Sequence, residues 1–281
     1  MKLQAAKELS LMANSMRQDV VRMLVSAGSG HTAGPLGMAD VFSVLFFHEM
    51  EYNAAQPKWE GRDRFVLSNG HICPILYSAM ARAGFFPLEE LLTLRKLGSR
   101  LQGHPSMHRL PGIENSSGPL GEGLSIACGM ALSGKMGKSG WRVYCAMSDG
   151  EHQEGSTWEA VMLAAKYKLD NLVAICDRNY IQIDGNTEDV MPLSDMAEKY
   201  RAFGWHAIDV DGHDHAALMA ALDEARETKG KPTMIIAKTV PGKGVSFAEN
   251  SYKWHGVAPN PEEGKRALGE LEAERKRIEQ S

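Results

Sequence analysis

Apolar and polar positions in the first part of the chain repeat with the period of an α-helix. Between about Leu3 and Ser26, apolar side chains recur at spacings of three and four residues. This pattern predicts an amphipathic helix with one buried face. Further helical patterns follow at Met38–Met50, Ile72–Ala83, Leu88–Leu97, Gly121–Ser133 and Gly155–Tyr167.

Short, continuous apolar runs, typical of buried strands, appear only from the middle of the chain onward: Arg142–Met147, Asn171–Cys176, Trp205–Val210 and Thr233–Lys238. Helical patterns separate them, the later two being Leu193–Phe203 and Asp214–Thr228. This alternation predicts an α/β fold in which helices flank both faces of a parallel sheet. The charged tail after Pro261 predicts a solvated surface helix. Because no repeat or linker is visible, we expect residues 1–281 to form one domain.

The composition is that of an ordinary globular protein, with 281 residues, 43% hydrophobic and 23% charged. A net charge of −4 gives no electrostatic reason to expect nucleic acid or an anionic membrane as partner. No apolar run approaches the roughly 18 residues of a membrane-spanning helix, and no signal peptide is visible. The four cysteines form no CxxC pair, so we expect buried, reduced thiols and a cytoplasmic location.

Polar residues directly follow two of the predicted strands. Asp149-Gly150 follows the first strand and Asn179 follows the second, at the spacing of about one βαβ unit. If the strands are neighbours, these side chains meet at the carboxyl edge of the sheet, where ligands bind. Carboxylate, amide and carbonyl oxygens suit Mg²⁺ or Ca²⁺ on phosphates, and the Gly150 N–H can approach a diphosphate. A plain turn and a capping asparagine explain the same residues, so both interpretations remain open.

Four histidines lie beside glycines: His31, His71, His104 and His255. A lone histidine most often serves packing or capping. Four of them near loops that can gather at one sheet edge favour a polar cluster in a cleft. Such imidazoles can bind phosphate oxygens, orient hydroxyl groups and move protons near neutral pH.

At these positions the sequence resembles the transketolases, in their N-terminal, diphosphate-binding half. The resemblance runs from about residue 10 to residue 260. It implies a thiamine diphosphate-binding fold, and a reaction in which a two-carbon ketol unit passes from a ketose phosphate to an aldose phosphate. The matching segments are, in order, Ser29–Asp40, Asp63–His71, Gly103–Pro105, Ser117–Ala131, Asp149–Gly155, Asp177–Gly185 and Lys238–Gly256.

The resemblance also implies which residues hold the cofactor. Asp149, Asn179 and the carbonyl of Ile181 would bind Mg²⁺ or Ca²⁺ on the diphosphate of thiamine diphosphate. The other implied contacts are to the diphosphate, from Gly150 and His71, and to the aminopyrimidine, from Gly118 and Leu120.

Three histidines are implied to face the reacting sugar. His104 would lie near the first hydroxyl of the sugar, while His31 and His255 would assist proton transfer, with His255 also contacting the cofactor. Glu154 and Glu159 match acidic residues that family members place between paired active sites, and Glu154 is therefore a candidate catalytic residue.

The sequence departs from the family pattern at a few positions. Thr32 and Ala33 stand where the family commonly has Pro-Gly, and Arg178 replaces a frequent acidic residue or asparagine. Ser148 replaces a frequent glycine, and Tyr252 a histidine that some members carry. None of these changes removes an implied metal ligand, but those at residues 32, 33 and 252 can alter the donor pocket.

Single-chain transketolases are more than twice as long as this chain, and their second half completes the cofactor site. We therefore expect the N-terminal subunit of a split transketolase, inactive alone and paired with a separate C-terminal subunit in an α₂β₂ assembly that acts on sugar phosphates. Two alternatives remain. One is the α subunit of a 2-oxo acid dehydrogenase, which shares the metal motif. The other is a non-catalytic assembly subunit. The histidine segments favour transketolase.

Overall fold

The computed structural model describes residues 2–280. At its centre is a parallel sheet with the strand order β1-β2-β3-β7-β6. These strands are β1 (Arg64–Leu67), β2 (Val143–Ser148), β3 (Leu172–Arg178), β6 (His206–Asp211) and β7 (Thr233–Lys238). Beyond the end of β3, the short antiparallel strands β4 (Ile181–Gln182) and β5 (Gly185–Asn186) pair with each other. The predicted α/β fold with a parallel sheet is confirmed.

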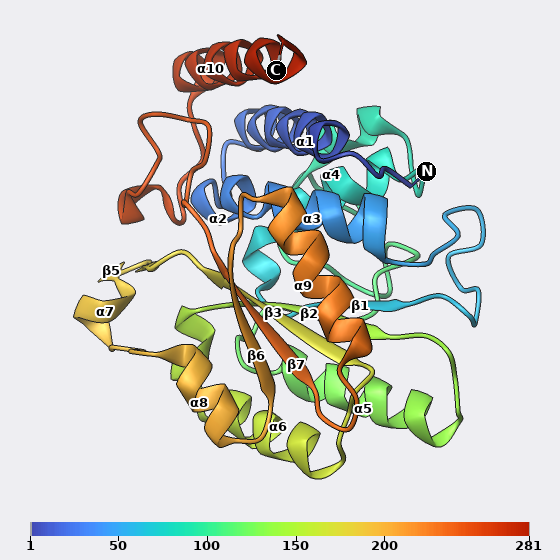
Figure 1. Ribbon diagram of the computed structural model, residues 1–281. Coiled ribbons are helices and arrows are strands. Elements are labelled where there is room, and N and C mark those ends of the chain that lie inside the picture. The colour runs from blue at the N-terminus through green and yellow to red at the C-terminus, as the bar shows by residue number, and fades with distance from the viewer. Residues whose placement is uncertain (1, 281) are drawn as a thin grey trace.

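Helices cover both faces of the sheet (Figure 1). One apolar cluster joins the sheet to α1 (Ala6–Ala27), α3 (Ala39–Val44), α4 (Cys73–Arg82) and α9 (His215–Glu227). A second cluster joins it to α5 (Gly123–Met136), α6 (Gly155–Lys166) and α8 (Met196–Ala202). The short helices α2 (Ala33–Gly37) and α7 (Thr187–Val190) lie in connecting segments, and α10 (Pro261–Gln280) follows the last loop.

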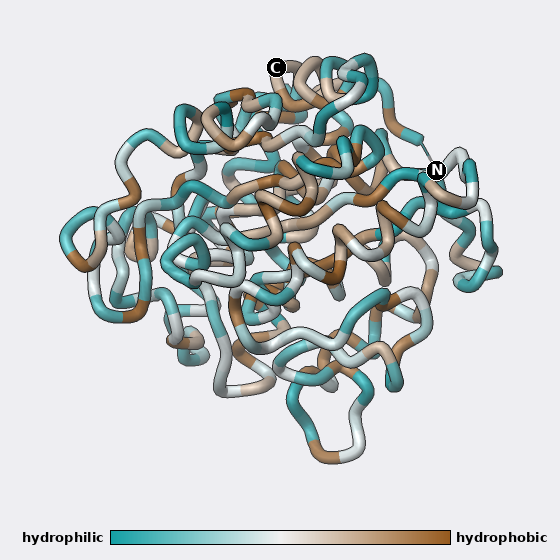
Figure 2. The backbone as a smooth tube through the Cα atoms, turned by 90° about the horizontal axis from the view of Figure 1, so that it is seen from below, coloured by the Kyte–Doolittle hydropathy of each residue, from teal (hydrophilic) through white to brown (hydrophobic). Residues whose placement is uncertain are grey.

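Strand β2 shows why its apolar run is continuous. Tyr144 and Ala146 belong to the first cluster, whereas Val143, Cys145 and Met147 belong to the second. Side chains on alternate faces of a doubly covered strand must all be apolar. In Figure 2 apolar segments gather along the central part of the chain trace, and many outer turns are hydrophilic.

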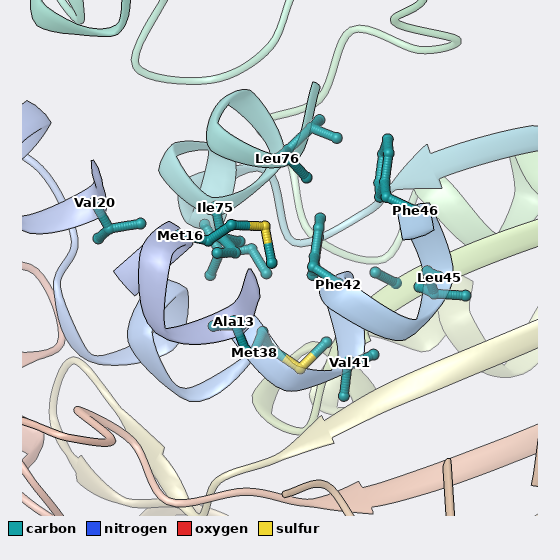
Figure 3. Close-up of a cluster of buried hydrophobic side chains, with 14 of the residues drawn as sticks. Ala13, Met16, Val20, Met38, Val41, Phe42, Leu45, Phe46, Ile75 and Leu76 are labelled. Atoms are coloured by element: carbon teal, nitrogen blue, oxygen red, sulfur yellow. The ribbon is translucent and has the colours of Figure 1, made fainter. Parts of the chain in front are cut away.

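The first cluster is built where the N-terminal helices meet. Met16 on α1 lies near Ile75 on α4 and Phe42 on α3 (Figure 3), and Val20 on α1 belongs to the same cluster. All four side chains are fully buried. The glycine-rich segment at residues 28–37 ends in α2, which contacts α1 and α4 in this helical layer.

Helix α10 lies at the surface, as the charged tail predicts, but one side of it is buried. It packs along α1, as Figure 1 shows, and buries Gly264, Ala267 and Leu271. A Cβ at position 264 would lie 2.4 Å from a methyl group of Val25. Asn14 donates a hydrogen bond to the carbonyl of Leu271 (2.9 Å). The prediction of a solvated surface helix therefore holds for most of α10 and misses the narrow apolar stripe that docks it on α1.

Three other predictions need correction. The expectation that strands begin only in mid-chain missed β1, whose four residues are too few to show a pattern. Leu88–Leu97 is not one α-helix, since a 3₁₀ helix ends at Thr93 and Arg95 has a positive φ of 59°. Met38–Met50 divides into α3 and a π-helical turn, Leu45–Glu49.

All four cysteines are buried and unpaired, which confirms the prediction of free thiols. Burial raises the pKa of each: Cys73 and Cys128 to about 12, and Cys145 and Cys176 also upward. Within residues 2–280, no helix has the length and apolar character needed to cross a bilayer.

Candidate active site

Two neighbouring strands bring the predicted metal-binding residues together. β2 and β3 pair in parallel, with Ser148 opposite Asp177. Asp149 follows β2 directly, and Asn179 follows β3 directly. The backbone N–H of Asp149 donates to the carbonyl of Asp177 (3.1 Å). The two segments therefore meet at the carboxyl edge of the sheet, as the spacing predicts.

The Asp149 carboxylate is almost fully buried and held by backbone donors. Its Oδ2 accepts hydrogen bonds from the N–H of Tyr180 (2.7 Å) and from the Arg178 guanidinium (3.2 Å). Its Oδ1 accepts one bond, from the N–H of Gly150 (2.7 Å). Burial raises the pKa of Asp149, against the lowering effect of these donors. Oδ1 keeps acceptor capacity for a cation, because a carboxylate oxygen can accept two bonds.

The Asn179 amide is oriented by partners on both sides. Its Nδ2 donates to the Asp177 carboxylate (2.7 Å), and its Oδ1 accepts from the N–H of Ile181 (3.0 Å). Asp177 is buried and also accepts the hydroxyl of Thr239. Burial is the main reason that its pKa rises, to about 7. The amide oxygen thus lies on the same side as the Ile181 segment, next to the Asp149 turn.

These oxygens make an incomplete donor set. They comprise one carboxylate, one amide and one backbone carbonyl, which suit Mg²⁺ or Ca²⁺. Among the described residues, no group of three or more His, Cys, Asp or Glu side chains is arranged for a metal ion. A cation bound here would need further oxygens from a ligand, as phosphates provide.

A cavity of about 330 Å³ lies over this edge. Gln182 lines this cavity, and its side-chain oxygen Oε1 is buried without a hydrogen-bond partner. At Gly118 an added Cβ would meet no atom within 4 Å. Asp149 lies directly beneath, bonded to Gly150. The other predicted site residues all line the cavity: His31, His71, His104, Gly118, Leu120, Gly150, Glu154, Asn179, Ile181 and His255.

Three of the four histidines are in ring contact. The centroids of His31 and His71 are 5.0 Å apart, those of His31 and His255 5.5 Å, and those of His71 and His255 5.3 Å. His104 lines the same cavity. His31 Nδ1 is buried without a partner, and within residues 2–280 no hydrogen bond fixes any of the four rings. Their nitrogens are therefore available to a ligand.

All four imidazoles are held in the neutral form. Burial, followed by the charges of His255, Arg95 and His104, lowers the pKa of His31 to about 4. Burial is also the main cause that lowers the pKa of His71, His104 and His255. At neutral pH these rings can accept protons as well as hydrogen bonds.

The two acidic residues assigned by resemblance lie at the outer side of this edge. Glu154 is exposed at the start of α6 and lines the cavity, whereas Glu159, on the same helix, is exposed outside it. The structure does not bring Glu159 together with the histidines.

Glu151 is a residue of the site that the sequence did not single out. It is fully buried, and its Oε1 accepts bonds from the N–H of Gly121 (2.7 Å) and the hydroxyl of Ser68. Its Oε2 accepts from the N–H of Ser148 (3.2 Å). It therefore ties together three segments around the cavity. A carboxylate inside a glycine-rich turn is a sequence signal for a residue of the site. The role of Glu151 could not be predicted from it, because Ser68 and Gly121 are distant in sequence.

Arg178 also gains a role from the structure. Its guanidinium pairs with Asp149 and with Glu188 (2.6 Å), and lies 4.0 Å from the ring centroid of Tyr180. One oxygen of Asp149 is thereby occupied by protein donors.

Several known proteins are similar to this chain over most of its length. A family model described as "Transketolase, thiamine diphosphate binding domain" matches residues 9–275. The chain is 41% identical over 267 residues to the 6-deoxy-6-sulfo-D-fructose transketolase subunit SqwG of Clostridium sp. (strain MSTE9), an alignment that covers 95% of this chain and 97% of that one. It is 40% identical over 271 residues to an apulose-4-phosphate transketolase subunit of Phocaeicola vulgatus, with 96% of each covered.

Among solved structures, the transketolase of Campylobacter jejuni matches with a TM-score of 0.85 and 32% identity. That match covers 100% of this chain and 48% of the other. The chain thus spans about half the length of this transketolase, but nearly the whole length of the two subunits.

Proposed function

The chain belongs to the transketolase family, in which it corresponds to the thiamine diphosphate-binding domain, and from this premise we propose that it is the N-terminal subunit of a two-subunit transketolase. The reaction is transfer of a two-carbon ketol unit from a ketose phosphate to an aldose phosphate. One observation carries the proposal: the oxygen donors after β2 and β3 and four neutral histidines line or underlie a single cavity.

The residues at the sheet edge fit the cofactor's diphosphate and its cation. Asp149, Asn179 and the carbonyl of Ile181 would hold Mg²⁺ or Ca²⁺, with the missing oxygens coming from the diphosphate. The Gly150 N–H and His71 would bind the diphosphate, and Gly118 and Leu120 the aminopyrimidine. When bound, thiamine diphosphate supplies the carbon nucleophile and the electron sink for cleavage of the C–C bond.

The histidines would act on the sugar. His104 would orient its first hydroxyl, while His31 and His255, neutral at working pH, would accept and return the hydroxyl proton. The low pKa of His31 favours a ring that is unprotonated before the sugar binds. Glu154, at the rim, would act across the interface between paired sites.

A separate C-terminal subunit would complete the site. Support comes from the two relatives of matching length, both named as transketolase subunits. Support also comes from Leu120 and Ile183, which line the cavity yet are 36% and 65% exposed. Apolar surface at a cofactor site is normally covered. The unpaired cysteines agree with a cytoplasmic location.

We propose that two copies of this chain pair through α5 and α6, which would give the α₂β₂ assembly. These neighbouring helices expose the large apolar side chains Ile126, Met162 and Leu163. Exposed apolar side chains of this size on adjacent helices are characteristic of an interaction surface.

Substrate choice tests the proposal. The chain is mixed with a C-terminal transketolase subunit from the same genome, thiamine diphosphate and Mg²⁺, and offered fructose 6-phosphate or a 2-oxo acid as donor, each with an aldose phosphate. We expect ketol transfer from the ketose phosphate only. Turnover of the 2-oxo acid in its place would contradict the proposal, and so would a complex that turns over neither donor.

A further inference from the structure

Two loops that carry catalytic candidates lie side by side at the cavity, with the rings of His31 and His255 in contact. The first loop, residues 28–32, precedes α2 and carries His31, and the second, residues 239–257, carries His255. Thr32 joins them through its hydroxyl, which donates to the carbonyl of Val257 (2.6 Å). Thr32 is almost fully buried, with 2% of its surface exposed. This hydrogen bond therefore links the residue after His31 to a residue two positions beyond His255.

The rings of His31 and His255 depend on their backbones for position. No hydrogen bond fixes either ring within residues 2–280, and His31 Nδ1 is buried without a partner. A Cβ at Gly256 would lie 3.8 Å from Nε2 of His31, so the ring rests against the backbone of the second loop. Any change in the spacing of the loops changes the spacing of the imidazoles.

We propose that Thr32 is a positioning residue that sets the separation of His31 and His255 through its bond to Val257. The proposal rests on the proposed function, because these two histidines are assigned there to proton transfer. Proline, common at this position in the family, has no side-chain donor. The threonine gives this chain a connection between the two loops that proline cannot make.

A second connection keeps the loops together when the hydroxyl is removed. The N–H of Gly242 donates to the carbonyl of Ala33 (2.9 Å). Position 242 has a φ of +79°, and a Cβ there would lie 2.4 Å from the carbonyl oxygen of Ala248. Loss of the Thr32 bond should therefore shift the loop end at residues 255–257 without unfolding the chain.

The effect on rate follows from geometry. A displacement of about 1 Å at a proton-transfer group costs on the order of 100-fold in rate. Because Thr32 does not line the cavity itself, its loss should lower kcat while cofactor affinity stays unchanged.

Two substitutions at one position separate shape from hydrogen bonding. Thr32→Val keeps the shape and removes the donor, whereas Thr32→Ser keeps the donor. Thr228→Val is the matched control, since this hydroxyl also donates to a carbonyl, that of Glu224 (2.9 Å) in α9, away from the cavity. Steady-state kcat and KM are measured on the reconstituted complex. Imidazole resonances of His31 and His255 are recorded by NMR on the full chain alone, after circular dichroism has established folding.

We expect Thr32→Val to lower kcat about 10- to 100-fold and to move both imidazole resonances, while Thr32→Ser and Thr228→Val leave both close to wild type. The proposal is overturned if Thr32→Val stays within about twofold of wild type with unmoved resonances, or if Thr32→Ser loses as much as Thr32→Val. A wild-type complex without ketol transfer would sink the proposed function instead, and the NMR comparison would still decide the role of Thr32.

Discussion

At the residue scale, the rings of His31, His71 and His255 lie within 5.5 Å of one another, and each has a pKa below the usual value for histidine. Burial is the first cause in each case. A cluster of protonated imidazoles at this spacing would be repulsive, whereas neutral rings can share the cavity with an anionic ligand and still donate hydrogen bonds.

The charge state gives a first prediction. An NMR pH titration of the full chain should show His31 titrating with a pKa of about 4, because burial and the nearby His255, Arg95 and His104 disfavour its charged form. In the unfolded chain the pKa of this histidine is near 6.5, so between about pH 4 and pH 6.5 the unfolded chain binds more protons than the folded chain. The free energy of unfolding should therefore fall as the pH drops from about 6.5 to about 4. A titration midpoint for His31 at or above 6.5 would refute this.

A second prediction concerns the cation. Asp149→Ala removes the only carboxylate of the donor set, so metal-dependent binding of thiamine diphosphate to the reconstituted complex should weaken by at least about 100-fold, more than is typical for the loss of an outer-shell partner. Calorimetry with and without Mg²⁺ measures it. Asp189→Asn, at an exposed position, is the control. Unchanged affinity in the Asp149 variant would remove the metal assignment.

The sequence predicts some of these residues and not others, for a physical reason. Asp149 and Asn179 follow strands, and parallel strands end at one edge, so their convergence follows from local pattern. Glu151 and Thr32 act through partners up to 225 positions away. Periodicity along the chain carries no information about such contacts. The sequence shows Thr32 only as a departure from the family pattern and does not indicate that its hydroxyl bonds to Val257.

At the element scale, α10 offers the clearest test of packing. Leu271 is completely buried against α1, so Leu271→Ala should lower the free energy of unfolding by about 2–5 kcal/mol. Urea denaturation followed by circular dichroism measures the change. Glu272→Ala, exposed on the next position of the same helix, should have little effect. Equal effects of the two substitutions would mean that α10 is solvated on all sides.

Elements were predictable where their burial is uniform. Strands β2, β3 and β7 are covered on both faces, which forces continuous apolar runs. Strand β1 has four residues between polar segments, too few to show periodicity. The 3₁₀ helix ends at Thr93 because Leu94 already leaves the helical region, with a ψ of 129°. Arg95 then has a positive φ, a conformation that no composition rule assigns to arginine.

At the scale of the whole molecule, the sheet presents its carboxyl edge and the histidine cavity together, with Leu120 and Ile183 uncovered at the rim. In the function proposed above, this chain would hold the diphosphate side of the cofactor, and a second subunit would cover the remaining side. The resemblance in sequence identified the family, and the match to a transketolase about twice as long shows how much of the fold this chain represents.

The most direct test compares the chain alone with the chain plus a C-terminal transketolase subunit from the same genome. Both are supplied with thiamine diphosphate, Mg²⁺, fructose 6-phosphate and an aldose phosphate, and ketol transfer is followed by product formation. We predict no transfer by either protein alone and transfer on mixing, in proportion to the limiting subunit. Robust ketol transfer by this chain alone would contradict the central claim that its active site is completed by a partner.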